Sequence, residues 1–496
     1  MSLAAAAPLT ILHTSDWHLG RRLYGHQRYE EFESFLAWLL DTIATERVDV
    51  LIVAGDIFDT MTPSNKAQAL YYEFLGTVST TCCQHVVIVA GNHDSPTFLD
   101  APSQILKFLN VHVIGTACED LGDEVLILDN SEGIPYCIIA AVPYLRDRDV
   151  RSSAAGESMD RKDANVISGI CAHYDTVAAV AKDLQHQVTK THARHIPIIA
   201  TGHLFAAGGS TTTDDGVRDL YVGNLGKISA DMFSSHFDYV ALGHLHVPQR
   251  VGGREHIRYS GSPIAMGFGE ARQQKQVLLV QFDASTVDIA ALSNPSPLTN
   301  QINNKKTAAR KTANHTSASH NFIDDLFGFD DVDNVEVVQN IASTVSEVNL
   351  LNHNESRQMR ISALPIPYFQ ALAQVSGDMQ TIEATICTLT QSRSASEPIW
   401  LEVVYTGDDI VANLREQIAV MVDGLSCEVL KIKNLSTYNK VLNQESASET
   451  LQDLNELEVF ERCLLVNEVT DTQKLTLRCA YEQIIYEIYD KDHHAE

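Results

Sequence analysis

The sequence predicts an α/β fold: a layered sandwich with mixed sheets, followed by a small α+β domain and a C-terminal helical segment. Two observations lead to this expectation. Strand-like and helix-like segments alternate through the first 290 residues, and a closely spaced series of strands ends this part. The chain has 496 residues, which is too long for one ordinary core, so two or three domains are expected.

The apolar residues of the first part define its elements. From Tyr29 to Ile43 they recur at helical spacing, which predicts an amphipathic helix. The run "VDVLIVAGD" (48–56) is continuously apolar, as expected for a strand covered on both faces, and a helix over 65–79 follows. The other expected strands are 9–15, 85–94, 136–144, 195–203, 237–246, 256–262 and 276–282, with a helix over 164–188 between two of them.

The composition changes after the first domain, which we place at 1–290. Residues 291–334 are polar and poor in large apolar side chains, which is typical of a flexible linker or insertion. A small α+β domain is expected over 335–440, and 441–496 is predicted to be helical. The expected elements of the second domain are a helix over 378–391, a strand over 399–406, a helix over 410–423 and a strand over 427–433.

Acidic residues dominate the chain. Asp and Glu total 64 against 36 Lys and Arg, and the formal net charge is −28. Taken alone, this charge argues against a nucleic-acid binder, because such proteins usually meet phosphates with basic residues. Clustered acids can also bind metal ions, and a bound metal inverts the local charge. The net charge therefore excludes neither class.

The cysteines and the apolar runs of the sequence indicate the cellular compartment. Nine cysteines occur without a CxxC pair, which favours reduced thiols over a disulfide framework. No apolar run approaches the roughly 20 residues that span a bilayer. The segment "MSLAAAAPLT" has no basic residue ahead of its small apolar run, which argues against a secretory signal. We therefore expect a cytoplasmic protein with no membrane partner.

Five predicted strands end in small or polar residues that can bind metals. These ends are Asp16-Trp17-His18, Gly55-Asp56, Gly91-Asn92-His93-Asp94, Gly202-His203 and Gly243-His244-Leu245-His246. Sites gather at the carboxyl ends of strands in open α/β sheets, so five such ends can converge. Each end alone is more simply a turn or a helix cap, and we expect Asp59 and Asp94 to cap the helices that follow them. The five ends together are better explained by one shared site.

The side chains at these ends indicate the chemistry. Two Asp, one Asn and four His, without Cys, suit Mn²⁺, Fe²⁺ or Zn²⁺. His244 and His246 are the strongest pair, because alternate residues of a strand point to the same face. Seven ligands are enough for two ions that share a carboxylate. Two ions about 3.5–4 Å apart suit phosphoester hydrolysis, because they activate water and stabilise the attacking and leaving oxygens.

The ordered motifs D-x-H, G-D-x-x-D, G-N-H-D, G-H and G-H-x-H resemble those of the calcineurin-like metallophosphoesterase superfamily. The surrounding segments "HTSDWHLGRRLYGHQRYEEF", "VALGHLHVPQ" and "YSGSPIAMGFGE" closely resemble one branch, the SbcD nuclease subunits of bacterial SbcCD complexes. The similarity is strong over 1–290. It continues more weakly through "SALPIPYFQALAQVSGDMQTIEATI", which resembles the capping domain of that family.

The resemblance implies roles for individual residues. One Mn²⁺ would be held by Asp16, His18, Asp56 and His246. The second would be held by Asp56, Asn92, His203 and His244, with Asp56 as the bridge. His93 matches the catalytic histidine of the family, which contacts the scissile phosphate and can protonate the leaving oxygen. Arg21, Arg22 and Lys66 are weaker candidates for DNA contacts, since solvated surface charge explains them equally well, and Asp59 is given no catalytic role.

The resemblance also implies a function and partners. It implies a two-metal-dependent DNA nuclease, with 3′→5′ exonuclease action on duplex ends and endonuclease cleavage of hairpins and single strands, in DNA recombination, repair and replication. The implied partners are DNA and an SbcC-type ATPase subunit, with a homodimer of the nuclease subunit inside a heterotetramer. The sequence has no G-x-x-x-x-G-K-[ST] loop, so any ATP dependence would come from the other chain.

Three questions remain open from the sequence. The apolar stripe near 451–465 either docks the ATPase or packs within its own domain. The same metals would also serve a phosphodiesterase or phosphatase that acts on small-molecule phosphoesters. A non-catalytic scaffold that bridges DNA and ATPase is a further alternative.

Overall fold

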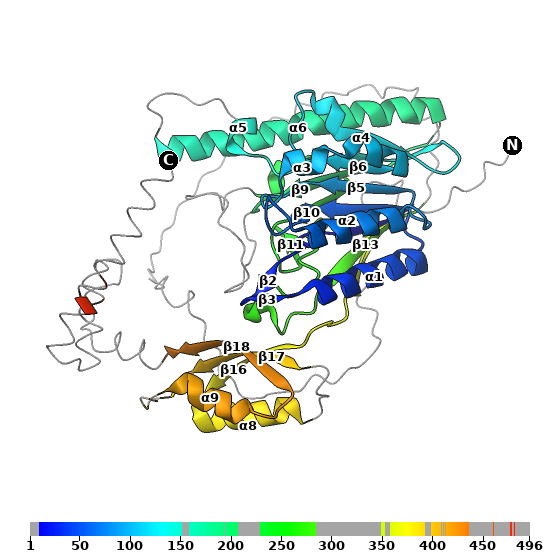
Figure 1. The fold of residues 1–496 in the computed structure, drawn as a ribbon. Helices are drawn as coiled ribbons and strands as arrows, with labels where there is room; N and C mark the ends of the chain where they lie inside the picture. Colours follow the sequence, from blue (N-terminus) through cyan, green and yellow to red (C-terminus); the bar gives the residue numbers. More distant parts are fainter. Residues whose placement is uncertain are drawn as a thin grey trace, which may run out of the picture.

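The computed structural model of the chain describes residues 9–150, 158–192, 194–206, 229–283, 349–352, 358–391, 398–407, 409, 411, 413–435, 460, 477, 478 and 481. The predicted linker (291–334) and nearly all of the predicted helical segment (441–496) therefore lie outside the described residues, as does the apolar stripe near 451–465 apart from Phe460. The described part forms a main body of two packed sheets and a smaller three-stranded domain (Figure 1).

The first sheet has seven strands in the order β14-β15-β13-β1-β4-β5-β6. Its parallel half is β1 (Leu9–Thr14), β4 (Val50–Ala54), β5 (His85–Val89) and β6 (Val111–Ile114). Its antiparallel half is β13 (Gln276–Phe282), β14 (Asn349–Asn352) and β15 (Gln358–Pro365). Helices α1 (Tyr29–Glu46) and α2 (Asn65–Val78) cover the outer face, and all five residues of β4 are buried, as its continuous apolar run predicts.

The second sheet has six strands in the order β11-β12-β10-β9-β8-β7. These are β7 (Val125–Asp129), β8 (Pro135–Ala140), β9 (Ile198–His203), β10 (Tyr239–Gly243), β11 (Gln249–Val251) and β12 (Arg254–Tyr259). Its outer face packs on the long helix α6 (Met159–His192). The inner faces of the two sheets meet in one apolar layer that includes Ile11, Ile52, Ile139 and Ile199. The main body is therefore a helix–sheet–sheet–helix sandwich, and the predicted fold class is confirmed.

The smaller domain is a parallel sheet of β16 (Leu372–Gly377), β17 (Ile399–Tyr405) and β18 (Cys427–Asn434). Helices α8 (Met379–Thr390) and α9 (Leu414–Val422) cover one face (Figure 1). Alternate strand residues such as Val375, Leu401 and Val403 point to these helices and form the core. The other face meets the hairpin β2 (Arg22–Leu23) and β3 (His26–Gln27) of the main body, where His26 Nε2 lies 3.2 Å from Glu428 Oε1.

One predicted boundary needs correction. The segment 358–365, expected in the α+β domain of 335–440, is strand β15, which pairs with β13 from Gln276↔Pro365 to Phe282↔Met359. No strand was predicted over this segment, and its local sequence pattern does not reveal which strand it pairs with. Met359 and Ile361 are buried in the layer between the two large sheets, and this burial fixes the pairing.

The short elements escaped the sequence analysis. They are α3 (Pro96–Asp100), α4 (Ser103–Leu106), α5 (Asp147–Val150), the 3₁₀ turns η1 (Lys107–Leu109), η2 (Leu121–Glu124), η3 (Ala230–Met232) and η4 (Phe268–Glu270), and the strands β2, β3, β6, β7, β11, β14 and β16. Among the described residues, no helix is long and apolar enough to cross a membrane. The seven cysteines in this part of the chain are all free thiols.

Candidate metal centre

The loops after β1, β4, β5 and β10 and the last residue of β9 meet at the carboxyl ends of their strands, where the two sheets face each other. They bring together the seven predicted ligands and the predicted catalytic histidine: Asp16, His18, Asp56, Asn92, His93, His203, His244 and His246. All eight side chains except that of Asn92 are buried. The expected convergence of five strand ends is thus a feature of the structure.

The first group of side chains surrounds His18. Its Nε2 lies 3.2 Å from Nε2 of His246 and 3.6 Å from Oδ2 of Asp56. Asp16, His18 and His246 each place one possible ligand atom within 4.8 Å of the others. Such a cluster of nitrogen and oxygen atoms can surround one cation.

The second group surrounds Asn92. Its Oδ1 lies 3.0 Å from Nε2 of His203 and 3.3 Å from Nδ1 of His244. His203 Nε2 also lies 3.2 Å from Oδ2 of Asp56. The same oxygen of Asp56 is therefore close to both groups, which is the position that a bridging carboxylate needs.

Unusual backbone conformations hold the ligands in place. Asp16, His18, Asp56 and His244 have φ angles of 54°, 49°, 51° and 104°, and they are half of the eight non-glycine residues with positive φ in the described chain. Non-glycine residues with positive φ are uncommon and cluster at functional sites. Backbone hydrogen bonds stabilise this arrangement, because the amides of Asp16 and His18 donate to the carbonyls of Gly55 and Asp56 at 3.0 and 2.9 Å.

His244 and His246 both lie in the site, but they do not lie on a strand as predicted. Strand β10 ends at Gly243, so these histidines are in the following turn and strand alternation does not orient them. The turn is fixed instead by the amide of His244, which donates to Oδ1 of Asp16 at 2.9 Å.

Two glycines allow the loops to approach each other. A Cβ on Gly91 would lie 2.2 Å from Oδ1 of Asp56. A Cβ on Gly55, which has a φ of +89°, would lie 2.3 Å from Nδ1 of His203. Neither position has room for a side chain, so glycine is required at both.

Asp59 and Asp94 do not cap helices, contrary to expectation. Ser64 caps α2 and Ser95 caps α3. The carboxylate of Asp94 accepts hydrogen bonds from the amides of Ile57, Phe58 and Gly91 at 2.9–3.1 Å, and so ties the loops after β4 and β5 together. Asp59 Oδ1 lies 3.3 Å from Nδ1 of His18, and the Asp59 carbonyl accepts from Nδ1 of His93 at 2.8 Å.

Acceptors at Nδ1 determine which imidazole nitrogen is available. His203 Nδ1 lies 2.9 Å from the carbonyl oxygen of Ala54, and a carbonyl can only accept, so this nitrogen carries the proton. Nε2 of His203, which lies beside Asp56 and Asn92, is then the nitrogen that the ring would offer to a metal. Asp59 provides the equivalent acceptor for His18.

The electrostatics of the site fit a bound cation. Burial lowers the pKa of His18 to about 4 and holds the pKa of His244 well below its usual value. Both rings are therefore neutral, and each can offer a nitrogen lone pair to a metal ion. Burial also raises the pKa of the Asp16 carboxyl. Burial alone would lower the pKa of His203, but the negative charge of Asp56 outweighs it and raises this pKa to about 9. A divalent cation would favour ionised Asp16 and displace the proton of His203, so the donor set fits such a metal.

The three candidates for DNA contacts occupy different surroundings. Arg21 Nη1 lies 3.3 Å from Oδ1 of Asp59 at the rim of the site. Arg22 is exposed on β2. Lys66 Nζ pairs with Glu33 Oε1 at 3.1 Å and lies over the ring of Tyr29, between α1 and α2. A role in DNA binding stays a prediction for all three.

Glu270, which lies in the η4 turn and is fully buried, is a further residue beside the site that no sequence motif predicts. Its Oε1 lies 3.5 Å from Nδ1 of His246. This glutamate ends the segment "YSGSPIAMGFGE". Its position among small and apolar residues was the one signal in the sequence that it is buried.

Comparison with known proteins identifies the family. Residues 9–248 match the family model for calcineurin-like phosphoesterases, and residues 368–467 match the type 5 capsule protein repressor C-terminal domain. The chain is 33% identical to the D subunit of nuclease SbcCD from Escherichia coli (strain K12) over 472 residues, which cover 95% of this chain and 96% of that protein. The chain belongs to the SbcD family.

Other SbcD relatives match over a smaller share of the chain. The D subunit of nuclease SbcCD from Rhodobacter capsulatus is 35% identical over 55% of this chain and 66% of its own length. The Bacillus subtilis protein of the same name is 32% identical over 58% of this chain and 71% of its own length. All eight site residues described above lie inside the phosphoesterase match, whose family is metal-dependent, whereas Glu270 lies beyond it. This SbcD-family chain is therefore a metal-dependent phosphoesterase.

Proposed function

We propose that the chain is a two-metal-dependent DNA nuclease that acts as the nuclease subunit of an SbcCD-type, ATP-dependent complex. The observation that carries the proposal is the position of Asp56, whose Oδ2 lies 3.6 Å from Nε2 of His18 and 3.2 Å from Nε2 of His203. Membership of the SbcD family supports the phosphodiester backbone of DNA as the substrate. No observation on the described residues favours a small-molecule phosphoester.

The ligands divide into two sets in this proposal. One ion would be held by Asp16, His18, Asp56 and His246, and the other by Asp56, Asn92, His203 and His244. The oxygen and nitrogen donors without thiolate suit Mn²⁺. Two such ions would supply an activated water nucleophile and electrostatic stabilisation of the attacking and leaving oxygens.

His93 is the proposed general acid. Its amide donates to Oδ1 of Asp56 at 2.9 Å, and its Nδ1 donates to the Asp59 carbonyl at 2.8 Å. These two contacts fix the backbone and the ring relative to the bridging carboxylate. Nε2 of the protonated ring then carries the proton that the leaving sugar oxygen takes up.

The proposed complex has two further interactions. An SbcC-type ATPase would supply the ATP dependence, since this chain has no phosphate-binding loop of its own. A second copy of the chain would form the nuclease dimer. Support for self-association comes from Ile105 and Phe108, neighbours on α4 and η1, which are 72% and 90% exposed although both are large and apolar.

The test is a cleavage assay on hairpin and blunt duplex DNA, with a nucleotide monoester and a generic phosphodiester as comparison substrates. The full chain is assayed with Mn²⁺ or EDTA, and with or without the ATPase partner and ATP. We expect cleavage of hairpin DNA that requires Mn²⁺. His93→Asn should lower the rate by about 10²–10⁴-fold while Mn²⁺ binding is retained.

His236→Asn is the matched control, because His236 is an exposed histidine that bonds Lys182 outside the site. This variant should cleave at the normal rate. Turnover of the nucleotide monoester without cleavage of any DNA, even in the presence of the partner, would replace the proposal with the small-molecule alternative.

A further inference from the structure

The two carboxylate oxygens of Glu270 have different surroundings. Oε2 contacts the ammonium of Lys275 and accepts from the amide of Met266 at 3.0 Å and the hydroxyl of Ser262 at 3.4 Å. Oε1 lies outside this network, and Nδ1 of His246 is 3.5 Å away. Because the side chain is fully buried, water does not compete for Oε1.

Lys275 fixes both Glu270 and His246. Its ammonium, which is also buried, contacts Glu270 Oε2 and donates to the backbone carbonyl of His246 at 3.1 Å. The positive charge of the Lys275 ammonium beside Oε2 favours the ionised carboxylate of Glu270. Glu270 is therefore an ionised acceptor, held at a set position relative to the His246 backbone.

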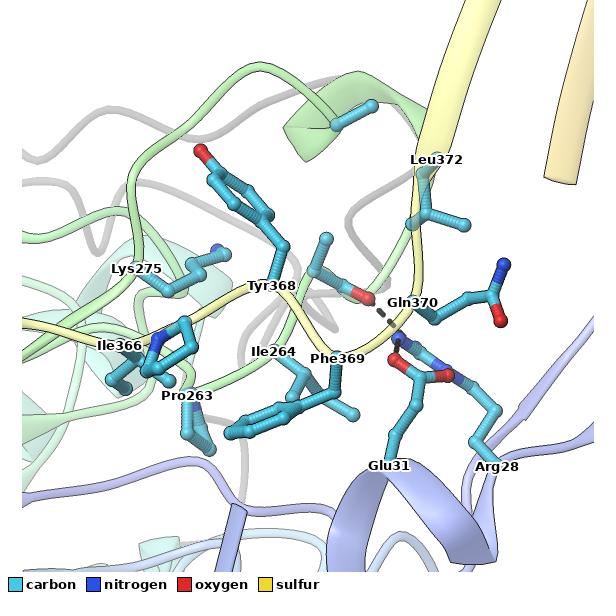
Figure 2. Close-up of a pocket in the computed structure, with 13 residues that line it drawn as sticks. Arg28, Glu31, Pro263, Ile264, Lys275, Ile366, Tyr368, Phe369, Gln370 and Leu372 are labelled. Atoms are coloured by element: carbon cyan, nitrogen blue, oxygen red, sulfur yellow. Dashed lines mark hydrogen bonds and ion pairs between the residues drawn. The ribbon is translucent and has the colours of Figure 1, made fainter. Parts of the chain in front are cut away.

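The backbone of Lys275 is itself anchored. The segment that leads from β15 to the three-stranded domain runs beside it, and Figure 2 shows Ile366 and Tyr368 of this segment next to Lys275. The amide of Ile366 donates to the Lys275 carbonyl at 2.8 Å, and the Gln274 side chain donates to the Ile366 carbonyl at 2.8 Å. The backbone beside the Lys275–Glu270 pair is thus tied to this segment by two hydrogen bonds.

The other nitrogen of His246 points to the metal centre, since Nε2 lies 3.2 Å from Nε2 of His18. An imidazole can bind a metal through Nε2 only if the proton is on Nδ1. We propose that Glu270 is a positioning residue, which accepts the Nδ1 proton of His246 and directs Nε2 to the metal, while Lys275 fixes Glu270. This role rests on the proposed metal-dependent function, and it matches the acceptors that Asp59 and Ala54 provide for His18 and His203.

The isosteric change Glu270→Gln gives a sharp test. Lys275 and the Met266 amide can only donate, so they hold the oxygen of the new amide. The NH₂ group then faces His246 and forces Nδ1 to accept, which moves the proton to Nε2 and blocks the ligand atom. We expect one Mn²⁺ site to lose about 10–100-fold in affinity and the other to keep its affinity. Glu270→Asp, which keeps the carboxylate, should recover part of the loss.

Glu124→Gln is the matched control for a structural effect. Glu124 is equally buried and its Oε2 lies 2.8 Å from Nε2 of His173, but this pair packs between η2 and α6, outside the metal centre. Mn²⁺ titration of the full chain by calorimetry gives the affinities, and urea unfolding without metal gives the stability. The control should lower stability and leave both Mn²⁺ affinities unchanged.

The outcomes separate the two proposals. If the unchanged chain binds two Mn²⁺ and Glu270→Gln binds both equally well, the positioning role is wrong while the metal-dependent function stands. If Glu124→Gln weakens Mn²⁺ binding as much as Glu270→Gln, the effect is structural and the positioning role is also wrong. If the unchanged chain binds no Mn²⁺, the proposed function fails and the role of Glu270 fails with it.

Discussion

Replacement of Gly91 by alanine tests how tightly the loop after β5 packs on the bridging carboxylate. A Cβ at this position would lie 2.2 Å from Oδ1 of Asp56 and 2.3 Å from its backbone nitrogen. Ordinary contact begins at 3.4 Å, so both atoms are more than 1 Å too close. The carboxylate can rotate away, but the backbone nitrogen cannot. Gly91→Ala must therefore separate the two loops that hold Asp56 and Asn92.

The size of the effect follows from this overlap. Overpacking of a filled interior costs about 1–3 kcal/mol, and we expect Gly91→Ala to lower the free energy of unfolding by this amount. The loops carry the bridge and a ligand of the second ion. A displacement of about 1 Å at a reacting centre can lower a rate by about 100-fold, so DNA cleavage should fall much more than the amount of folded protein.

The assays are urea unfolding and Mn²⁺-dependent cleavage of hairpin DNA. Gly76→Ala is the control, because Gly76 lies in α2 and an added Cβ meets nothing within 4 Å. Alanine favours a helix interior by up to about 1 kcal/mol over glycine, so the control should be as stable as the unchanged chain or more stable. If Gly91→Ala keeps full stability and full cleavage, the close approach of these loops is not a requirement of the site.

Two further predictions concern the fold and the assembly. Burial, with a contribution from His85, lowers the pKa of His112 from 6.5 to about 4, and Nδ1 of His85 lies 3.2 Å from Nε2 of His112. The stability that this shift provides is therefore fully present above pH 6.5 and is lost as the pH falls towards 4. Between pH 8 and pH 5 the free energy of unfolding should fall by about 2 kcal/mol for this reason. Urea unfolding at the two pH values measures the fall, and His112→Gln should remove it. The same pH dependence in this variant would contradict the prediction. Phe108→Asp should weaken self-association by about 3 kcal/mol or more, roughly 100-fold in the dissociation constant, because a symmetric contact counts the side chain twice. Sedimentation analysis measures this shift, and an unchanged dissociation constant would exclude Phe108 from the interface.

The sequence was informative for elements whose apolar pattern is unambiguous. Strand β4 is buried on both faces and α1 has one apolar face, so continuous and helical periodicities identify them directly. Strand β7 alternates irregularly between buried and exposed residues and gives no such pattern. Strand β15 was not among the predicted strands, and its pairing with β13 depends on burial of Met359 and Ile361 between two sheets that are formed by distant segments.

The site follows the same division. The ligand types at five strand ends predict where the centre forms, because the carboxyl ends of neighbouring strands lie at one edge of a sheet. No equivalent rule predicts the residues that hold these ligands in place. Asp94 ties two loops through the backbone amides of Ile57 and Phe58, and Glu270 reaches His246 from a turn 24 residues later in the chain. Such contacts depend on the path of the loops, which local propensity does not determine.

The centre combines strain with unusually dense support. Four ligand residues have positive φ, and each conformation of this kind costs of order 1–3 kcal/mol, so it persists only where the surroundings over-determine it. Here two sets of hydrogen bonds hold the conformations in place. The amides of Asp16 and His18 donate to the loop after β4, and the Asp94 carboxylate accepts hydrogen bonds from three backbone amides. Apart from the hydrogen bond between Gly91 and Asp94, which lies within one loop, these contacts link different loops, so moving one loop disturbs the ligands on the others. The ligand geometry is therefore a property of the five loops together, which explains why a methyl group at Gly91 is expected to affect both stability and cleavage.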